Sequence, residues 1–279
     1  MEHQLRRIAL LSDLHGNLTA TRAVLADAKT RSVTDYAVLG DLLMPGPGTQ
    51  ELLDLLHDLH PLVWLTGNWE QLLFAVNEDQ IDPKRPNNVY FAILADYVMR
   101  RLRPGQLQEL HDNPISAMRT INGLHIGFSH NERDFASGHD LYPDRQQENF
   151  DRLFAPGQDI AVYGHIHQEM LRTSSKGQLI INPGAVGQPY SPWRPIFRDQ
   201  RASYAILQIT PEGYTDLEFH HVAYDVEAEI KLAADLDLPY LPLYRHLRRT
   251  GRTITHNQHL LAKFNAAWGY DKAVLKLLK

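Results

Sequence analysis

The stretch RIALLSDLHGN, residues 7–17, joins a short apolar run to a polar ending, and this combination decides the fold. Residues 8–11 are all apolar, as expected for a strand that is buried on both faces. Asn17 can cap the helix that the spacing of apolar residues predicts from Leu18 to Lys29. A strand that leads through a polar turn into a helix of this length predicts a parallel sheet with helices packed on it.

Apolar runs with similar polar endings recur further along the chain. They read YAVLGD at 36–41, LVWLTGN at 62–68 and DIAVYG at 159–164, and the last continues as HIH at 165–167. Asn122-Gly123 is a hairpin signal between predicted strands at Met118–Ile121 and His125–His130. Strand–helix–strand units of this kind place the chain in the α/β class.

The other predicted elements divide the chain into a domain and two helical additions. Helices are expected at Thr49–Leu59, Glu70–Asn77, Asn88–Leu102, Pro104–His111 and Asp144–Phe154, and strands at Leu179–Asn182, Ser203–Thr210 and Tyr214–Val222. Residues 71–113 contain no predicted strand, and we interpret them as a helical insertion that covers a site. From Asp225 the chain is predicted to be helical, with interruptions at Pro239 and Pro242. We therefore predict one domain over residues 1–224 and a C-terminal helical extension over residues 225–279.

Composition limits the kinds of site and partner. The 279 residues include 15 histidines and no cysteine, and the formal net charge is −5. Without cysteine there is no disulfide scaffold, thiolate nucleophile or iron–sulfur cluster, so any metal must be held by histidine, carboxylate and amide oxygen. The acidic balance argues against duplex nucleic acid as a partner. No targeting segment and no stretch of roughly 20 apolar residues is visible, so we expect a cytoplasmic protein with no membrane partner.

Five predicted strands end in residues that commonly bind metals. These residues are Asp13, His15, Asp41, Asn68, His130, His165 and His167. Ligands of open α/β sheets bind beyond the carboxyl ends of the strands, so one sheet edge receives all seven side chains. Each residue alone has an ordinary explanation as a turn former, a helix cap or a surface histidine. Their joint placement at strand ends favours a metal site.

This set of donors suits a pair of divalent metal ions. Seven nitrogen and oxygen ligands, one of them a carboxylate able to bridge, suffice for two ions that clamp a phosphoryl group. Such a pair also lowers the pKa of a bridging water and stabilises the attacking and leaving oxygens. Imidazole and carboxylate without thiolate favour Mn, Fe, Zn, Ni or Co, which are the cofactors that we expect.

The motifs together resemble those of the calcineurin-like metallophosphoesterases, in particular the bacterial and archaeal branch with an NPGS-type loop. In chain order they are Asp13-x-His15-Gly16-Asn17, Gly40-Asp41, Gly67-Asn68, His130, Gly164-His165-x-His167 and Asn182-Pro183-Gly184-Ala185-Val186-Gly187-Gln188-Pro189. They span residues 13–189, about two thirds of the chain. The resemblance implies a four-layer α/β/β/α sandwich, in which two mixed sheets carry helices on their outer faces.

The resemblance also implies a role for each ligand. Asp13, His15 and His167 would hold one metal, and Asn68, His130 and His165 would hold the second. Asp41 would bridge the two metals, Asn68 would also touch the substrate phosphate, and a metal-bridging hydroxide would attack phosphorus in line. The resemblance thus assigns catalysis to Asp41, Asn68 and His130.

Two positions depart from the family pattern. The family usually has a histidine, which protonates the leaving oxygen or stabilises its charge, where this chain has Trp69. An indole N–H can donate a hydrogen bond but cannot serve as a general acid, so either the substrate has a good leaving group or another histidine substitutes, His139 being the candidate. The second departure is Met44, where the family often has a glycine, although Gly46 and Pro47 match.

Several other residues have ordinary interpretations that we prefer. The Asn182–Pro189 loop is expected to shape the metal pocket without giving ligands. Arginines at 194, 198 and 201, and the basic residues Arg245, His246, Arg248, Arg249 and Arg252, are interpreted as solvated surface, with phosphate binding as the alternative. Tyr90, Phe91 and Tyr97 are assigned to the core, and His220 and His221 to structural roles.

We therefore predict a dinuclear metal-dependent phosphoesterase for small phosphorylated, nucleotide-type substrates. Phosphodiesters and phosphoanhydrides, including dinucleoside polyphosphates, are favoured because the acid position is empty. The alternatives are a protein or small-molecule phosphomonoesterase and a non-catalytic scaffold that keeps the fold. The C-terminal extension is open to interpretation as a dimer arm, a lid or simple helical packing.

Overall fold

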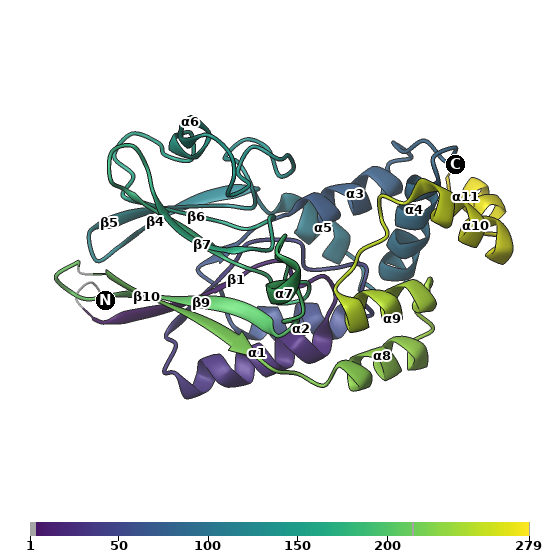
Figure 1. Cartoon of the computed structure of the whole chain (residues 1–279), viewed down its shortest axis with the longest axis horizontal. Coiled ribbons are helices and arrows are strands. Elements are labelled where there is room, and N and C mark those ends of the chain that lie inside the picture. Colours follow the sequence, from purple (N-terminus) through teal and green to yellow (C-terminus); the bar gives the residue numbers. More distant parts are fainter. Residues whose placement is uncertain (1–3, 214, 279) are drawn as a thin grey trace.

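Two five-stranded sheets form the centre of the computed structural model, which describes residues 4–213 and 215–278 (Figure 1). The first sheet has the strand order β10 (Thr215–Val222), β9 (Ala202–Ile209), β1 (Arg6–Leu11), β2 (Asp35–Val38) and β3 (Val63–Trp64). The second has the order β4 (Ser116–Ile121), β5 (Leu124–Ser129), β6 (Ile160–Tyr163), β8 (Leu179–Pro183) and β7 (Glu169–Thr173). Each sheet combines parallel strands with antiparallel neighbours.

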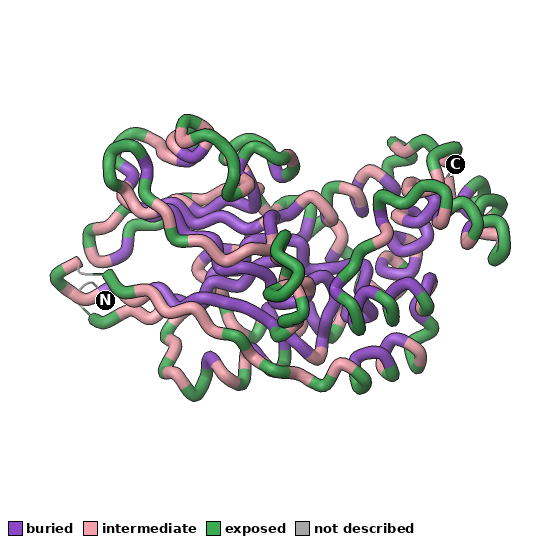
Figure 2. The backbone as a smooth tube through the Cα atoms, viewed as in Figure 1, coloured by how far each residue is buried: buried purple, intermediate pink, exposed green. Residues whose placement is uncertain are grey.

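Strand β1 shows why the central strands read as unbroken apolar runs. Ile8 and Leu10 belong to the core between the two sheets, whereas Ala9 and Leu11 belong to the core beneath the helices. Successive side chains of a strand point to opposite faces of the sheet, and here both faces are covered. All four residues are therefore buried, and Figure 2 shows burial concentrated along such inner strands.

Helices cover the outer faces of both sheets. Helices α1 (Leu18–Thr30) and α2 (Gln50–Asp58) lie along the first sheet (Figure 1), and the short α6 (Gln147–Asp151) lies on the opposite side of the molecule. Phe150 of α6 packs with Tyr163 and Ile180 of the second sheet. The predicted four-layer α/β/β/α sandwich is thus confirmed.

The helical insertion and the C-terminal extension lie together at one end of the sandwich (Figure 1). Residues 71–113, all of them described, hold no strand. The helices of the two regions are α3 (Asn68–Asn77), α4 (Pro86–Met99), α5 (Gln106–Asp112), α8 (Val226–Asp235), α9 (Leu241–Thr250), α10 (Gln258–Trp268) and α11 (Tyr270–Leu277). Both α10 and α11 pack on α4, and Asn265 donates a hydrogen bond to the Pro86 carbonyl at 2.9 Å. The division at residue 225 stays a prediction.

The structure differs locally from the sequence predictions at several elements. Strand β7 was not predicted, because it is a half-exposed edge strand of mixed polarity without a continuous apolar run. Helix α6 has only five residues of the predicted Asp144–Phe154. Pro242 does not interrupt the tail but sits in the first turn of α9, where its missing N–H is harmless. The predicted strand Tyr214–Val222 is seen as β10, and Tyr214 lies outside the described residues.

None of the helices described at residues 4–213 and 215–278 has the length and apolar character needed to cross a membrane.

The core between the sheets is expected to dominate stability. Phe128 of β5 is 1% exposed and lies within this core, so Phe128→Ala should lower the free energy of unfolding by about 3–5 kcal/mol. Phe135→Ala is the matched control, because Phe135 is 66% exposed, and it should change stability by no more than about 0.5 kcal/mol. Urea denaturation of both variants measures the difference. Equal losses would contradict the assigned core.

Candidate metal centre

The structure brings all seven predicted ligands to one place. They follow the carboxyl ends of β1, β2, β5 and β6, and Asn68 is the first residue of α3. Two groups with ligand atoms within 4.8 Å of one another are formed by Asp13, His15, Asp41 and His167, and by Asp41, His130 and His165. We call these the first and the second group.

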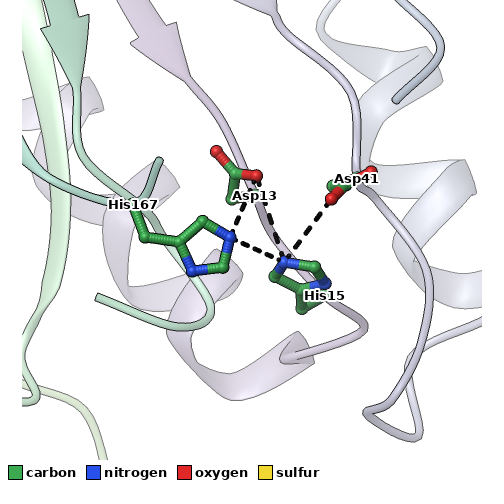
Figure 3. Close-up of side chains that lie close together, drawn as sticks. All are labelled: Asp13, His15, Asp41 and His167. Carbon is green, nitrogen blue, oxygen red and sulfur yellow. Dashed lines mark hydrogen bonds and ion pairs between the residues drawn. The ribbon is translucent and has the colours of Figure 1, made fainter. Parts of the chain in front are cut away.

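Short distances link the members of the first group (Figure 3). His167 Nε2 lies 3.1 Å from His15 Nε2 and 3.2 Å from Asp13 Oδ1. His15 Nε2 also lies 3.7 Å from Asp41 Oδ2. Four residues from three strand ends therefore direct donor atoms at a common point.

The second group is equally close and includes Asn68. The Asn68 Oδ1 atom lies 3.0 Å from His130 Nε2 and 2.8 Å from His165 Nδ1. His130 Nε2 lies 3.5 Å from Asp41 Oδ1. Asp41 thus presents one carboxylate oxygen to each group, which is the geometry that a bridging ligand requires.

Backbone carbonyls fix the tautomer of each imidazole. A carbonyl oxygen can only accept, so the ring nitrogen that faces it must carry the proton. The pairs are His15 Nδ1 with Met44 O at 2.8 Å, His130 Nδ1 with Leu39 O at 2.7 Å, His165 Nε2 with Gly138 O at 2.9 Å and His167 Nδ1 with Gln188 O at 2.7 Å. Each neutral ring therefore directs a lone pair at the centre, as outer contacts of metal-binding histidines do.

The buried electron-pair donors that lack a hydrogen-bond partner fit a cation. Asp13 Oδ2 accepts from the Ser12 hydroxyl and the His165 N–H, but Asp13 Oδ1 is buried and has no hydrogen-bond partner among the described residues. His15 Nε2 and His167 Nε2 lie 3.1 Å apart, and in the neutral form of both rings each of these atoms carries a lone pair. Buried acceptors without donors are costly, and a divalent ion removes this cost. The residues present therefore fit a metal site of nitrogen and oxygen donors.

Burial sets the protonation of these groups. It lowers the pKa of His15 to about 3 and that of His165 to about 4, so both rings are neutral at pH 7 and keep a free lone pair. Burial raises the pKa of Asp41, and the carboxylates of Glu70 and Asp13 raise it further. Burial also raises the pKa of Asp13, but the surrounding histidines, His167 first, lower it by more. Such clustering of perturbed groups is typical of functional sites.

Five of the predicted ligands adopt a left-handed backbone. The φ angles are 54° at Asp13, 50° at His15, 52° at Asp41, 66° at His165 and 59° at His167. This conformation is uncommon outside glycine and costs on the order of 1–3 kcal/mol per residue. It turns the chain sharply beyond each strand. Such strain persists only where surrounding contacts hold it, which again marks these turns as functional.

Glu70 is a buried residue to which the sequence assigned no role. Its carboxylate accepts hydrogen bonds from the backbone N–H groups of Asp41, Leu42, Leu43 and Gly67, at 2.8–3.2 Å. Burial raises the pKa of Glu70, and these bonds oppose the rise. Glu70 thereby ties the turn of Asp41 to the start of α3. The signal was present, since a glutamate three residues after Gly67 completes a capping box.

The Asn182–Pro189 loop supports the first group from outside. Val186 N–H donates to Ser12 O and Gly187 N–H to Asp13 O, both at 2.9 Å. A side chain at position 187 is excluded, because a Cβ atom there would lie 1.9 Å from the Leu14 carbonyl oxygen. The next residue, Gln188, supplies the carbonyl that holds His167. The loop shapes the centre as expected.

The structure locates both departures from the family pattern. Trp69 stands edge-on to His15, with ring centroids 5.2 Å apart, and its backbone N–H donates to Asp41 Oδ1 at 2.8 Å. Met44 has a φ of 55°, which explains why a glycine is suitable there, and its carbonyl still holds His15.

The candidate substitute acid, His139, lies in an exposed loop. Its ring stands 5.3 Å from the Tyr142 ring, and the preceding residue, Gly138, contacts His165 through its carbonyl. No contact between the His139 side chain and either group is seen in the described part of the chain.

The interpretation of the tail arginines as solvated surface was wrong at one position. Arg245, Arg249 and Arg252 are exposed, but Arg248 is only 3% exposed.

Arg194, Arg198 and Arg201 are exposed, and Arg201 pairs with Asp199. His220 and His221 pair with Glu218 and Glu169. Tyr90 and Tyr97 are in the core as expected, and Phe91 is partly buried against it.

The chain is similar in sequence and fold to known proteins. The family model of the calcineurin-like phosphoesterase superfamily domain matches residues 7–212. An uncharacterized protein of Methanocaldococcus jannaschii is 30% identical over 238 residues, which cover 79% of this chain and 88% of that protein. A crystal structure of a metallophosphoesterase from Sphaerobacter thermophilus is 26% identical with a TM-score of 0.66, covering 88% of this chain and 100% of that one. A hypothetical protein of Pyrococcus horikoshii shares the fold, with 18% identity, a TM-score of 0.70, and coverage of 88% and 99%.

Removing the charge of Glu70 should disturb both folding and metal binding. Glu70→Gln leaves buried N–H groups without a full partner, so we expect a loss of about 2–4 kcal/mol of unfolding free energy. Because the turn of Asp41 loosens, Mn²⁺ affinity should fall by about 10–100-fold. Denaturation and isothermal titration with Mn²⁺ measure the two effects. Glu148→Gln, at an exposed position of α6, is the control, and equal behaviour of the two variants would refute the role of Glu70.

Proposed function

This chain belongs to the calcineurin-like phosphoesterase superfamily, and from that premise we propose that it is a dinuclear metal-dependent phosphoesterase. We propose further that it hydrolyses phosphodiester or phosphoanhydride bonds of small, nucleotide-type substrates. The observation that carries the proposal is Asp41, which presents one oxygen to each of two donor groups. A single mononuclear site would need only one of these groups.

The donor atoms suggest how the ions would be held. Asp13, His15 and His167 would hold one ion, Asn68, His130 and His165 the other, and Asp41 would join them. Two such ions, when bound, supply positive charge that stabilises a phosphoryl group, and they lower the pKa of a bound water molecule. We propose that they are drawn from Mn, Fe, Zn, Ni and Co, because the donors are imidazole, carboxylate and amide oxygen.

The chain's own residues define what surrounds the phosphoryl group. Asn68 is also placed to orient a substrate oxygen through its amide, since its side chain lies between the two histidines of the second group. The Trp69 ring packs against His15. The Phe91 ring of α4 packs against Trp69, and the centroids of the Trp69 and Phe91 rings lie 5.3 Å apart. A wall formed by the helical insertion favours small substrates over a protein surface.

Trp69 also favours substrates with good leaving groups. The indole N–H has no hydrogen-bond partner among the described residues and is free to orient an oxygen, but it cannot release a proton. Loss of general acid catalysis costs about 10²–10⁴-fold for a poor leaving group. Diesters of acidic alcohols and phosphoanhydrides avoid this cost because their leaving groups need no proton.

Asp41→Asn tests the dinuclear proposal. Hydrolysis of bis(p-nitrophenyl) phosphate should fall by about 10³-fold, which corresponds to about 4 kcal/mol of transition-state stabilisation. Metal analysis should show a fall from two ions per chain to one or none. Asp58→Asn, at an exposed position of α2, should leave both values unchanged. A wild-type protein that holds no metal and remains inert after reconstitution would instead favour the scaffold alternative.

Trp69→His tests the leaving-group argument. The variant should gain about 10²-fold on alkyl phosphate esters and little on p-nitrophenyl esters, because only the former need a proton donor. Trp69→Phe, which removes the N–H but keeps an aromatic ring beside His15, serves as the control. No gain on alkyl esters would mean that another acid is in place, and a rate loss in His139→Ala would then identify it.

A further inference from the structure

The C-terminal extension places a buried cation beside the metal centre. Arg248 of α9 is 3% exposed and lies outside the part of the chain that the family model matches. Its Nη1 donates to the Gly187 carbonyl and lies 3.5 Å from the Tyr224 hydroxyl. Among residues 4–213 and 215–278, no carboxylate oxygen lies within 4.0 Å of an Arg248 nitrogen, which is the distance that defines an ion pair.

The charge of Arg248 therefore lacks a direct counter-ion. Its Nε atom is fully enclosed without a hydrogen-bond partner among the described residues. Arg248 lies near the ring of Tyr244, whose hydroxyl donates a hydrogen bond to the buried carboxylate of Glu229 at 2.8 Å. The Glu229 carboxylate also accepts a hydrogen bond from Thr19 N–H at 2.9 Å. Both of these donors are neutral, so the Glu229 carboxylate offsets the charge of Arg248 only at a distance, and an anion in direct contact with the guanidinium would stabilise it further.

Arg248 is anchored to the loop that supports the first group. It bonds to Gly187, whose N–H donates to Asp13 O and whose neighbour Gln188 holds His167. Burial lowers the pKa of His15, and the positive charge of Arg248 is among the smaller contributions to this shift. The guanidinium is thus close to the centre without being a ligand of it.

A second unpaired polar group lies in the same region. Tyr90 of α4 is 4% exposed, and its hydroxyl makes no hydrogen bond in the described part of the chain. Its ring contacts Phe91, which contacts Trp69, which stands against His15. Burial raises the pKa of Tyr90, while the charge of Arg248 opposes the rise, so the hydroxyl stays protonated and able to donate.

We infer that Arg248 binds a second phosphoryl group of the substrate, next to the one that reacts, with the Tyr90 hydroxyl as an additional donor. The centre would then select compounds with two adjacent phosphates, which are phosphoanhydrides rather than simple diesters. One guanidinium group can donate two parallel charge-assisted hydrogen bonds to two oxygens of a phosphate. If divalent ions offset the charges of Asp13 and Asp41, a second phosphoryl group would give Arg248 the direct partner that its Nε lacks among the described residues.

This inference rests on the proposed function, and its test separates the two. Isothermal titration of the Mn²⁺-loaded full chain with inorganic phosphate probes the metal centre alone. Methylenediphosphonate, which carries two adjacent phosphoryl groups and cannot be hydrolysed, probes the added contact. Metal content is measured before and after each titration, so that removal of Mn²⁺ by the probe is detected. Wild-type protein should bind the diphosphonate at least about 10-fold more tightly than phosphate.

Arg248→Gln should abolish the preference for the diphosphonate while phosphate affinity and metal content stay within about threefold. Arg248→Lys keeps the charge and should retain part of the preference. Arg245→Gln, at an exposed position of the same helix, should behave as the wild type. If Arg248 only supported the loop, its loss would lower metal content and both affinities together, and that result would overturn the inference.

Two further outcomes are decisive. Phosphate binding without any preference for the diphosphonate would refute the role of Arg248 and leave the phosphoesterase proposal intact. Binding of neither probe by the metal-loaded wild type would overturn both.

Discussion

The arrangement on which the rest of the structure depends is a set of electron-pair donors packed together around a common point. His15 Nε2 and His167 Nε2 lie 3.1 Å apart, and Asp13 Oδ1 beside them has no partner among the described residues. Such donors repel one another unless a cation joins them. The energy that holds them together comes from the two buried cores of the sandwich and from backbone carbonyls that fix each imidazole.

The two helical additions complete the surroundings of this centre. The insertion contributes Phe91 and Tyr90, and the extension contributes Arg248. The extension packs against the insertion, with the Tyr90 and Tyr240 rings 4.7 Å apart, so each addition fixes the position of the other. The family domain, with its two groups of candidate ligands, is in this way surrounded by groups that belong to this chain's additions.

The central strands and the clustering of the seven candidate ligands could be predicted from the sequence because both follow local rules. A strand buried on both faces is apolar throughout, and its polar ending marks the sheet edge where ligands gather. Strand β7 escaped prediction and helix α6 was predicted too long, because exposed edges and single turns have weak patterns. The burial of Glu70 and Arg248 is a tertiary property. Even so, Leu243, Tyr244, Leu247 and Arg248 recur at helical spacing, which places this arginine on the apolar face of α9.

The Asn182–Pro189 loop joins the two sheets at the centre. It continues from β8 of the second sheet, and its backbone N–H groups donate to the carbonyls of Ser12 and Asp13 beyond β1. The Ala185 N–H donates to the Ser203 hydroxyl of β9, and this hydroxyl donates to the Ala185 carbonyl. The sheets therefore cannot slide or spread without breaking these bonds. We therefore expect the first group to resist contraction around a small ion and widening for a large one. Discrimination among divalent metals then depends on how well each ion's preferred bond lengths match a fixed opening, rather than on adaptation by the protein.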